Sequence, residues 1–141
     1  IPASLVGSEM CIRDRNNTAL AGHVEIGDWA ILSGYTLVHQ FCKIGPHSFS
    51  GMGTSIGKDV PAYVTVAGSP AEAKTINAEG LRRRGFDTAE IGELRRAFKV
   101  LYRQGLTLDA ALERLQNMAV ETPSIQTLID SLKQSQRGIV R

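Results

Sequence analysis

The sequence has few cysteines and no long hydrophobic run, and both absences narrow its class. Its 141 residues include only Cys11 and Cys42, too few for a disulfide scaffold or a cysteine-rich zinc site. No apolar stretch approaches the roughly 20 residues of a membrane-spanning helix, so we expect no membrane span. The net charge of +2 does not favour nucleic acid as a partner. We therefore expect a globular protein in the reducing environment of the cytoplasm.

Charged residues are also scarce in the first half of the chain. Those between positions 16 and 61 are Glu25, Asp28, Lys43, Lys58 and Asp59. The residues from position 62 onward are rich in both signs of charge. This change in composition indicates two different architectures in one chain.

The first fifteen residues, IPASLVGSEMCIRDR, match nothing that follows them. A secretory signal would place its basic residues first, whereas Arg13 and Arg15 come last here. The string SLVGSEMCIRDR resembles a translated sequencing adapter. We interpret residues 1–15 as a non-native leader, with a disordered native terminus as the alternative.

From Leu20 onward an aliphatic residue recurs at almost every sixth position, and a small or β-branched residue follows each one four positions later. The seven consecutive hexads are LAGHVE, IGDWAI, LSGYTL, VHQFCK, IGPHSF, SGMGTS and IGKDVP. A period of six fits neither an amphipathic helix nor an alternating strand. It is typical of a parallel β-helix built from hexapeptides.

Each hexad is expected to supply one short strand and one corner of a triangular coil. The aliphatic and the small residue would share the narrow interior, and three hexads would complete a coil. Glycines after the aliphatic positions, as in Gly27 and Gly45, are expected to allow tight corners. A little over two coils cannot bury their own open ends, so we expect further coils upstream or partner chains.

The residues after Pro61 predict a last strand, a turn around Gly68 and then a helical region. A short helix is expected from Ala78 to Arg84, ending at Gly85. Three longer amphipathic helices are predicted to start at Asp87, at Thr107 and at Thr122 before Pro123. Their short connections predict antiparallel packing around a small core.

Three histidines and one arginine run are the candidate functional residues. The histidines, His23, His39 and His47, could form an open zinc site between chains or serve the fold alone. The run from Arg82 to Arg84 suits phosphate, because the guanidinium fork matches its oxygens; a solvated basic face is the alternative. We expect no metal.

Several segments together resemble the acyl-carrier-protein:UDP-N-acetylglucosamine O-acyltransferase family of lipid A biosynthesis. They are NNTALAGHVEIGDWAI, VHQFCKIG, KDVPAYVTVAGSPA, INAEGLRRRGF and the tail with YRQGLTLDAALE and RGIVR. The resemblance covers residues 16–141 and implies a homotrimer of left-handed parallel β-helices, of which this chain holds only the C-terminal coils. It implies β-helix coils and an exit strand over 16–72, and a small all-α domain over 73–141.

The resemblance implies acyl transfer without a cofactor. In this family an acyl carrier protein donates a 3-hydroxyacyl chain to the 3-hydroxyl of UDP-N-acetylglucosamine, and a histidine acts as general base. Gly22 matches the backbone N–H that stabilises the oxyanion. His23 and Gln40 match positions that hold the sugar nucleotide or acyl group, and His39 matches another position of the site. The residues that match the nucleotide end are Asn77, Glu79, Arg83 and Arg84.

Three positions depart from the family pattern. The general-base histidine would fall near Ser4, inside the leader, so we expect the chain as written to be inactive. Pro70 stands where some members have histidine. Met52 stands where glycine leaves the acyl groove long, which implies a donor nearer about ten carbons than fourteen; alternatively, Met52 only packs a corner. The alternative functions are the N-acyltransferase of the same pathway and an inactive trimeric fragment that binds nucleotide.

Overall fold

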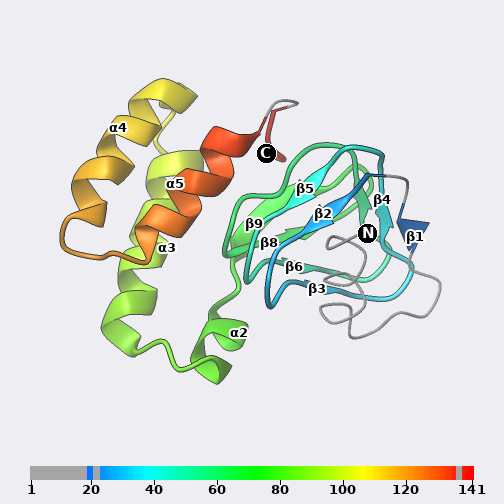
Figure 1. Ribbon diagram of the computed structural model, residues 1–141, viewed down its shortest axis with the longest axis horizontal. Coiled ribbons are helices and arrows are strands. Elements are labelled where there is room, and N and C mark those ends of the chain that lie inside the picture. Colours follow the sequence, from blue (N-terminus) through cyan, green and yellow to red (C-terminus); the bar gives the residue numbers. More distant parts are fainter. Residues whose placement is uncertain (1–18, 21–22, 136–137) are drawn as a thin grey trace.

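The computed structural model describes residues 19–20, 23–135 and 138–141, which form a β-helix followed by a group of helices (Figure 1). The leader assigned to residues 1–15 and the oxyanion donor Gly22 lie outside the described residues. Seven strands of two residues each form the coils. They are β1 (Ala19–Leu20), β2 (Glu25–Ile26), β3 (Ile31–Leu32), β4 (Leu37–Val38), β5 (Lys43–Ile44), β6 (Phe49–Ser50) and β7 (Ser55–Ile56).

The strands pair in parallel with the partner one coil away, as the period of six predicts. Leu20 pairs with Val38, Ile26 with Ile44, and Leu32 with Ser50, so each coil spans three hexads. Both hexad positions predicted to face inward are buried wherever the structure describes their side chains. The buried residues include Ile26, Leu32, Val38, Ile44 and Ile56, together with Val24, Ala30, Thr36, Cys42, Ser48 and Thr54. The parallel coil architecture is therefore confirmed.

The last coil is shorter than the hexads predict. Ser50 pairs with Val66, and Val60 bridges Ile44 where an uninterrupted period would place residue 62. Val60 therefore takes an aliphatic strand position, although the sequence pattern assigned it a small-residue position. Asp59 contributes to the change, because its carboxylate accepts the Lys43 backbone N–H at 2.8 Å.

Two further strands complete the sheet that contains β3 and β6. β8 (Val64–Ala67) runs parallel to β6, and β9 (Glu72–Ile76) returns antiparallel to β8. The turn between them contains Gly68 at φ 102°, as expected for a glycine turn. The domain division at residue 72 stays a prediction, and the strand pairing itself continues to Ile76.

Gly27 and Gly45 are required by the close approach of successive coils. A Cβ on Gly27 would lie 2.6 Å from the backbone nitrogen of Pro46, and one on Gly45 would lie 2.7 Å from the Cα of Ala62. Neither glycine is in the left-handed region, so contact with the next coil explains them better than corner geometry.

Among the residues that the structure describes, four helices follow the strands. They are α2 (Ala78–Arg83), α3 (Thr88–Tyr102), α4 (Leu108–Ala119) and α5 (Ile125–Gln134). Two predicted N-caps are confirmed: Asp87 accepts the Glu90 N–H at 2.7 Å, and Thr107 accepts the Ala110 N–H at 3.2 Å.

The last helix begins later than its proline predicts. Residues 122–124 form a turn closed by the Ile125 N–H to the Thr122 carbonyl, so α5 starts at Ile125. In Figure 1, α4 is the outermost helix and α5 lies between it and the coils. Ser131 of α5 accepts the Ala62 N–H at 3.0 Å and fixes the helix to the last coil. Over the described residues, no helix combines the length and apolarity needed to cross a membrane.

Candidate functional site

The fourth residue of each of the first six hexads turns the chain in the left-handed backbone conformation. His23, Trp29, Tyr35, Phe41 and His47 all have φ between 60° and 68°. This conformation is uncommon for bulky residues. It places a row of rings along the corners of the coils, where four of the five are exposed and His47 is partly buried. Rings six residues apart are visible in the sequence, but their shared conformation is not.

The first edge of the prism is the corner between the β1–β4–β7 sheet and the β2–β5 sheet. His23 lies here in one coil and Phe41 in the next, with nearly parallel rings whose centroids are 5.2 Å apart. His39 and Gln40 precede Phe41 in the same corner and are exposed. The fold therefore brings His23, His39 and Gln40 to one edge.

The second edge is the corner between the β2–β5 sheet and the sheet that contains β3, β6 and β8. Trp29 and His47 occupy it in successive coils, and Tyr63 follows below. The His47 ring stacks on Tyr63 at 5.6 Å and meets the edge of Phe86 at 5.2 Å. Phe86 comes directly after the turn that ends α2, so this aromatic cluster joins α2 to the coils.

The predicted nucleotide residues lie on α2, beside the second edge. Asn77 caps this helix: its Oδ1 accepts the Gly80 N–H at 3.2 Å, while its Nδ2 donates to the His47 carbonyl at 3.0 Å. This capping bond explains the glycine at position 80, because a Cβ there would lie 2.9 Å from the Asn77 Cγ. Asn77 thus has a structural role that the sequence pattern did not reveal.

The arginines at the end of α2 differ in their partners. Glu79 pairs with Arg82 at 3.3 Å and with Arg83 at 3.5 Å. Arg84 has no carboxylate partner in the part of the chain that the structure describes, and its guanidinium carbon lies 4.0 Å from the centre of the Trp29 ring. Arg84 is therefore the member of the run whose charge is free to meet a ligand.

The surroundings of His47 favour the neutral form of its imidazole. Burial lowers the pKa of its imidazole, the Arg84 charge lowers it further, and Asp28 partly opposes both effects. With its ring between Tyr63 and Phe86, His47 serves the packing of the second edge. This agrees with the structural alternative considered for this histidine.

The third edge is the corner between the sheet of β3 and β6 and the sheet of β4 and β7. It carries Tyr35 and, one coil further, Met52 and Gly53, where Gly53 adopts the left-handed conformation with φ 72°. The Met52 side chain is 76% exposed. No part of the described chain covers it, and it lies on a different edge from both groups of candidate site residues.

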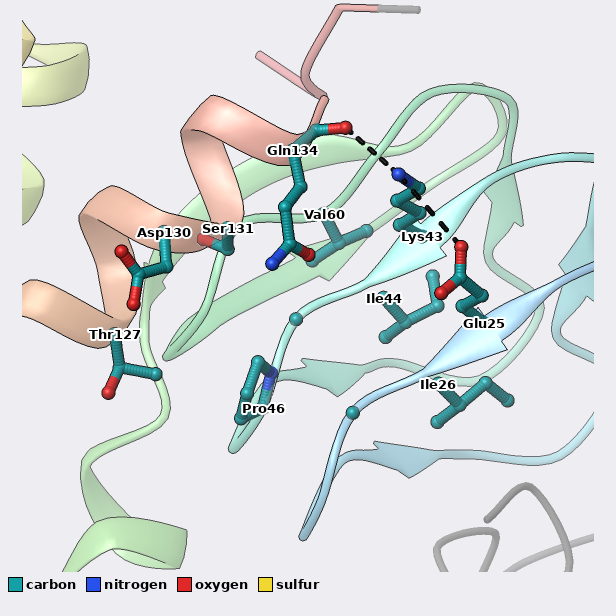
Figure 2. A pocket seen from close by; sticks show the side chains of 12 residues that line it. Glu25, Ile26, Lys43, Ile44, Pro46, Val60, Thr127, Asp130, Ser131 and Gln134 are labelled. Atoms are coloured by element: carbon teal, nitrogen blue, oxygen red, sulfur yellow. Dashed lines mark hydrogen bonds and ion pairs between the residues drawn. The ribbon is translucent and has the colours of Figure 1, made fainter. Parts of the chain in front are cut away.

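A cavity of about 330 Å³ separates α5 from the β2–β5 sheet (Figure 2). Its lining mixes Glu25 and Lys43 from the strands with Asp130 and Gln134 from the helix. Lys43 donates to the Gln134 carbonyl at 3.0 Å and lies 3.9 Å from Glu25 (Figure 2). None of the predicted site residues lines this cavity.

No metal-ligand cluster occurs among residues 19–20, 23–135 and 138–141, where no three histidine, cysteine or acidic side chains come together. His23 and His39 share the first edge, whereas His47 lies on the second. A site from these three histidines within one chain is therefore not formed by the described residues.

Comparison with known proteins gives the family. The model for UDP N-acetylglucosamine O-acyltransferase, domain 2, matches residues 59–140. The acyl-[acyl-carrier-protein]–UDP-N-acetylglucosamine O-acyltransferase of Ectopseudomonas mendocina is 64% identical over 126 residues, covering 89% of this chain and 49% of that protein. The Pseudomonas aeruginosa enzyme of the same name is 63% identical over the same span.

Solved structures agree with this assignment. LpxA from Acinetobacter baumannii superposes with a TM-score of 0.89 at 46% identity, covering 93% of this chain and 51% of that one. The UDP-N-acetylglucosamine acyltransferase of Arabidopsis gives 0.83 at 37% identity, covering 89% and 47%. The chain therefore belongs to the UDP-N-acetylglucosamine O-acyltransferase family, and it spans about half the length of the curated relatives it matches.

Proposed function

We propose that this chain is the C-terminal half of an enzyme that transfers a 3-hydroxyacyl group from acyl carrier protein to the 3-hydroxyl of UDP-N-acetylglucosamine. This is the first step of lipid A biosynthesis, and it takes place in the cytoplasm. The names of the relatives supply both substrates, and the match extends over 126 residues, 89% of this chain.

The observation that carries the proposal is the distribution of the site residues over separate edges. His23, His39 and Gln40 lie on the first edge, whereas Arg83 and Arg84 end a helix beside the second. Two corners of one prism cannot face one another. A homotrimer of left-handed coils with parallel axes would place the first edge of one chain against the second edge of its neighbour and so complete the site.

The exposed apolar residues support assembly of this kind. Trp29, Tyr35, Leu37 and Phe41 are each between 43% and 60% exposed, and all lie in neighbouring coils. The three aromatic residues lie on the three different edges of the prism and Leu37 lies on β4, so one partner chain could not cover them all. Covering the coils with two partner chains would bury these residues.

Each candidate residue then has a role. The general base takes the proton of the 3-hydroxyl, the resulting oxygen attacks the thioester carbonyl, and the Gly22 N–H stabilises the tetrahedral oxyanion. The intermediate collapses with loss of the carrier thiol. His23, His39 and Gln40 hold the sugar and the acyl chain, while Asn77, Glu79, Arg83 and Arg84 hold the nucleotide.

Met52 fits the role of an acyl-length determinant in such an assembly. Its exposed side chain lies on the third edge, so this role requires the acyl tail to extend to that edge from the sugar site. A methionine there shortens the space available to the acyl tail. The preferred donor is then closer to about ten carbons than fourteen.

The missing general base provides the test. The chain as written is expected to show no meaningful acyl transfer, because a positioned base contributes about 10²–10⁴-fold. Replacing residues 1–15 with upstream coils that carry the histidine should restore turnover. Changing that histidine to alanine should abolish turnover again and leave UDP binding nearly intact. Turnover of the chain as written at the restored rate would refute the assignment and make His23 or His39 the base.

A further inference from the structure

We propose that Trp29 is a positioning residue for Arg84, holding its guanidinium where it meets the diphosphate of the nucleotide sugar. The proposal rests on the proposed function, which places Arg84 at the nucleotide. It adds Trp29, a residue of the coils, to the proposed nucleotide-binding residues, which otherwise lie at α2. Neither the hexad pattern nor the family resemblance assigned a role to Trp29.

The geometry is that of a cation held over an aromatic face. The Arg84 guanidinium carbon lies 4.0 Å from the centre of the Trp29 ring, well within the range of about 6 Å over which this interaction is favourable. Trp29 stands in a corner with φ 64°, between β2 and β3. A guanidinium stacked on its ring keeps its N–H groups free at its rim for phosphate oxygens.

The partners of the neighbouring arginines show why Arg84 needs this support. Arg82 and Arg83 are both oriented by Glu79. Within the described residues Arg84 has no carboxylate to orient it, and Trp29 takes that place without neutralising its charge. The stack also draws Arg84 up to the coil that contains His23, because Trp29 lies six residues after that histidine.

The stack is not needed to attach α2 to the coils. The Asn77 N–H donates to the Tyr63 carbonyl at 2.7 Å, and the Asn77 amide donates to the His47 carbonyl at 3.0 Å. Phe86 packs against His47 and Tyr63 at the other end of the helix. Trp29 contributes a contact to Arg84 at the C-terminal end of α2, in addition to those that fix the helix in place.

The test measures the affinity of the full-length protein for UDP and for uridine by calorimetry. Trp29→Met removes the aromatic face and keeps an apolar side chain. We expect UDP affinity to fall roughly two- to thirty-fold, the range of a cation–π contact, with little change for uridine. Trp29→Phe should restore most of the loss. Tyr35→Met, which changes a ring in the same conformation on another edge, is the matched control.

The double variant Trp29→Met with Arg84→Met should bind UDP no more weakly than Arg84→Met alone. The positioning role would be overturned if Trp29→Met lost UDP and uridine affinity equally, or lost neither. In that case Arg84→Met would still report on the nucleotide site. Unchanged UDP affinity in Arg84→Met would overturn the nucleotide assignment itself.

A second measurement needs no change at Trp29. It is the only tryptophan of this sequence, so its fluorescence can be followed with any upstream tryptophan replaced by phenylalanine. UDP should change its emission in the protein with Arg84 and not in Arg84→Met. An emission that UDP leaves unchanged in both would overturn the proposal.

Discussion

Replacing Gly45 by alanine tests whether close approach of the coils is what requires glycine after the aliphatic residue. The new Cβ would lie 2.7 Å from both the Cα of Ala62 and the carbonyl carbon of Pro61. Both are backbone atoms of the next coil, which the Gly45 N–H holds through the Val60 carbonyl at 2.8 Å. The coil must therefore shift, and overpacking of this kind costs about 1–3 kcal/mol.

Gly57→Ala is the matched control, because Gly57 also follows an aliphatic residue. A Cβ there would meet only the His39 ring at 3.7 Å, an ordinary contact. Since alanine restricts the unfolded chain, we expect this variant to be neutral or more stable by up to about 1 kcal/mol.

Urea unfolding of the full-length protein, at one fixed protein concentration, measures both free energies of unfolding. We expect Gly45→Ala to be the less stable variant by about 1–4 kcal/mol. Equal stability of the two variants with unchanged m values would refute this reasoning. Corner geometry would then be the better explanation for the glycine at position 45.

Three further predictions concern acyl length, pH and assembly. In the full-length enzyme, Met52→Gly should raise the preference for 3-hydroxyacyl donors of about fourteen carbons over donors of about ten. The reason is that each buried methylene contributes roughly 0.8 kcal/mol. If the ratio of the two products in competition assays did not change, the length role of Met52 would be excluded. Because the pKa of His47 is lowered in the folded state, the free energy of unfolding should fall as the pH drops below about 6.5 and level off below the folded pKa. His47→Phe should remove that slope in urea titrations. Residues 16–141 should sediment as a trimer, and a stable folded monomer would contradict the assembly.

The period of six predicted the coils because it reports directly on the interior. The narrow interior takes one aliphatic side chain, such as Leu32, and one small side chain, such as Cys42, from each hexad. The spacing of these residues therefore reveals the fold. The helix starts at Asp87 and Thr107 were predictable for a similar reason, since a capping oxygen must precede the first free N–H groups. These features depend on local sequence alone.

The features that sequence could not predict depend on contacts between distant segments. The shortened last coil needs the Asp59 carboxylate to meet the Lys43 N–H, sixteen residues apart. The double use of Asn77 as helix cap and as link to His47 is also visible only in three dimensions. The candidate site residues come from the family resemblance, and their roles stay a prediction. The edge shared by His23, His39 and Gln40 follows from three hexads per coil, whereas the place of Arg84 beside the second edge depends on how α2 packs against the coils.

Because the last coil is shortened, the β-helix can gain or lose coils at only one of its two ends. The antiparallel strand β9 and the C-terminal residues, whose Val140 N–H donates to the Asp59 carbonyl at 2.8 Å, close the lower end. Above that end the described strands pair in one repeated register. Duplication or loss of a whole coil upstream therefore leaves each face aligned, whereas the same event below β7 would misalign the closing strands. We expect homologous proteins to differ in coil number only on the N-terminal side of this closed end.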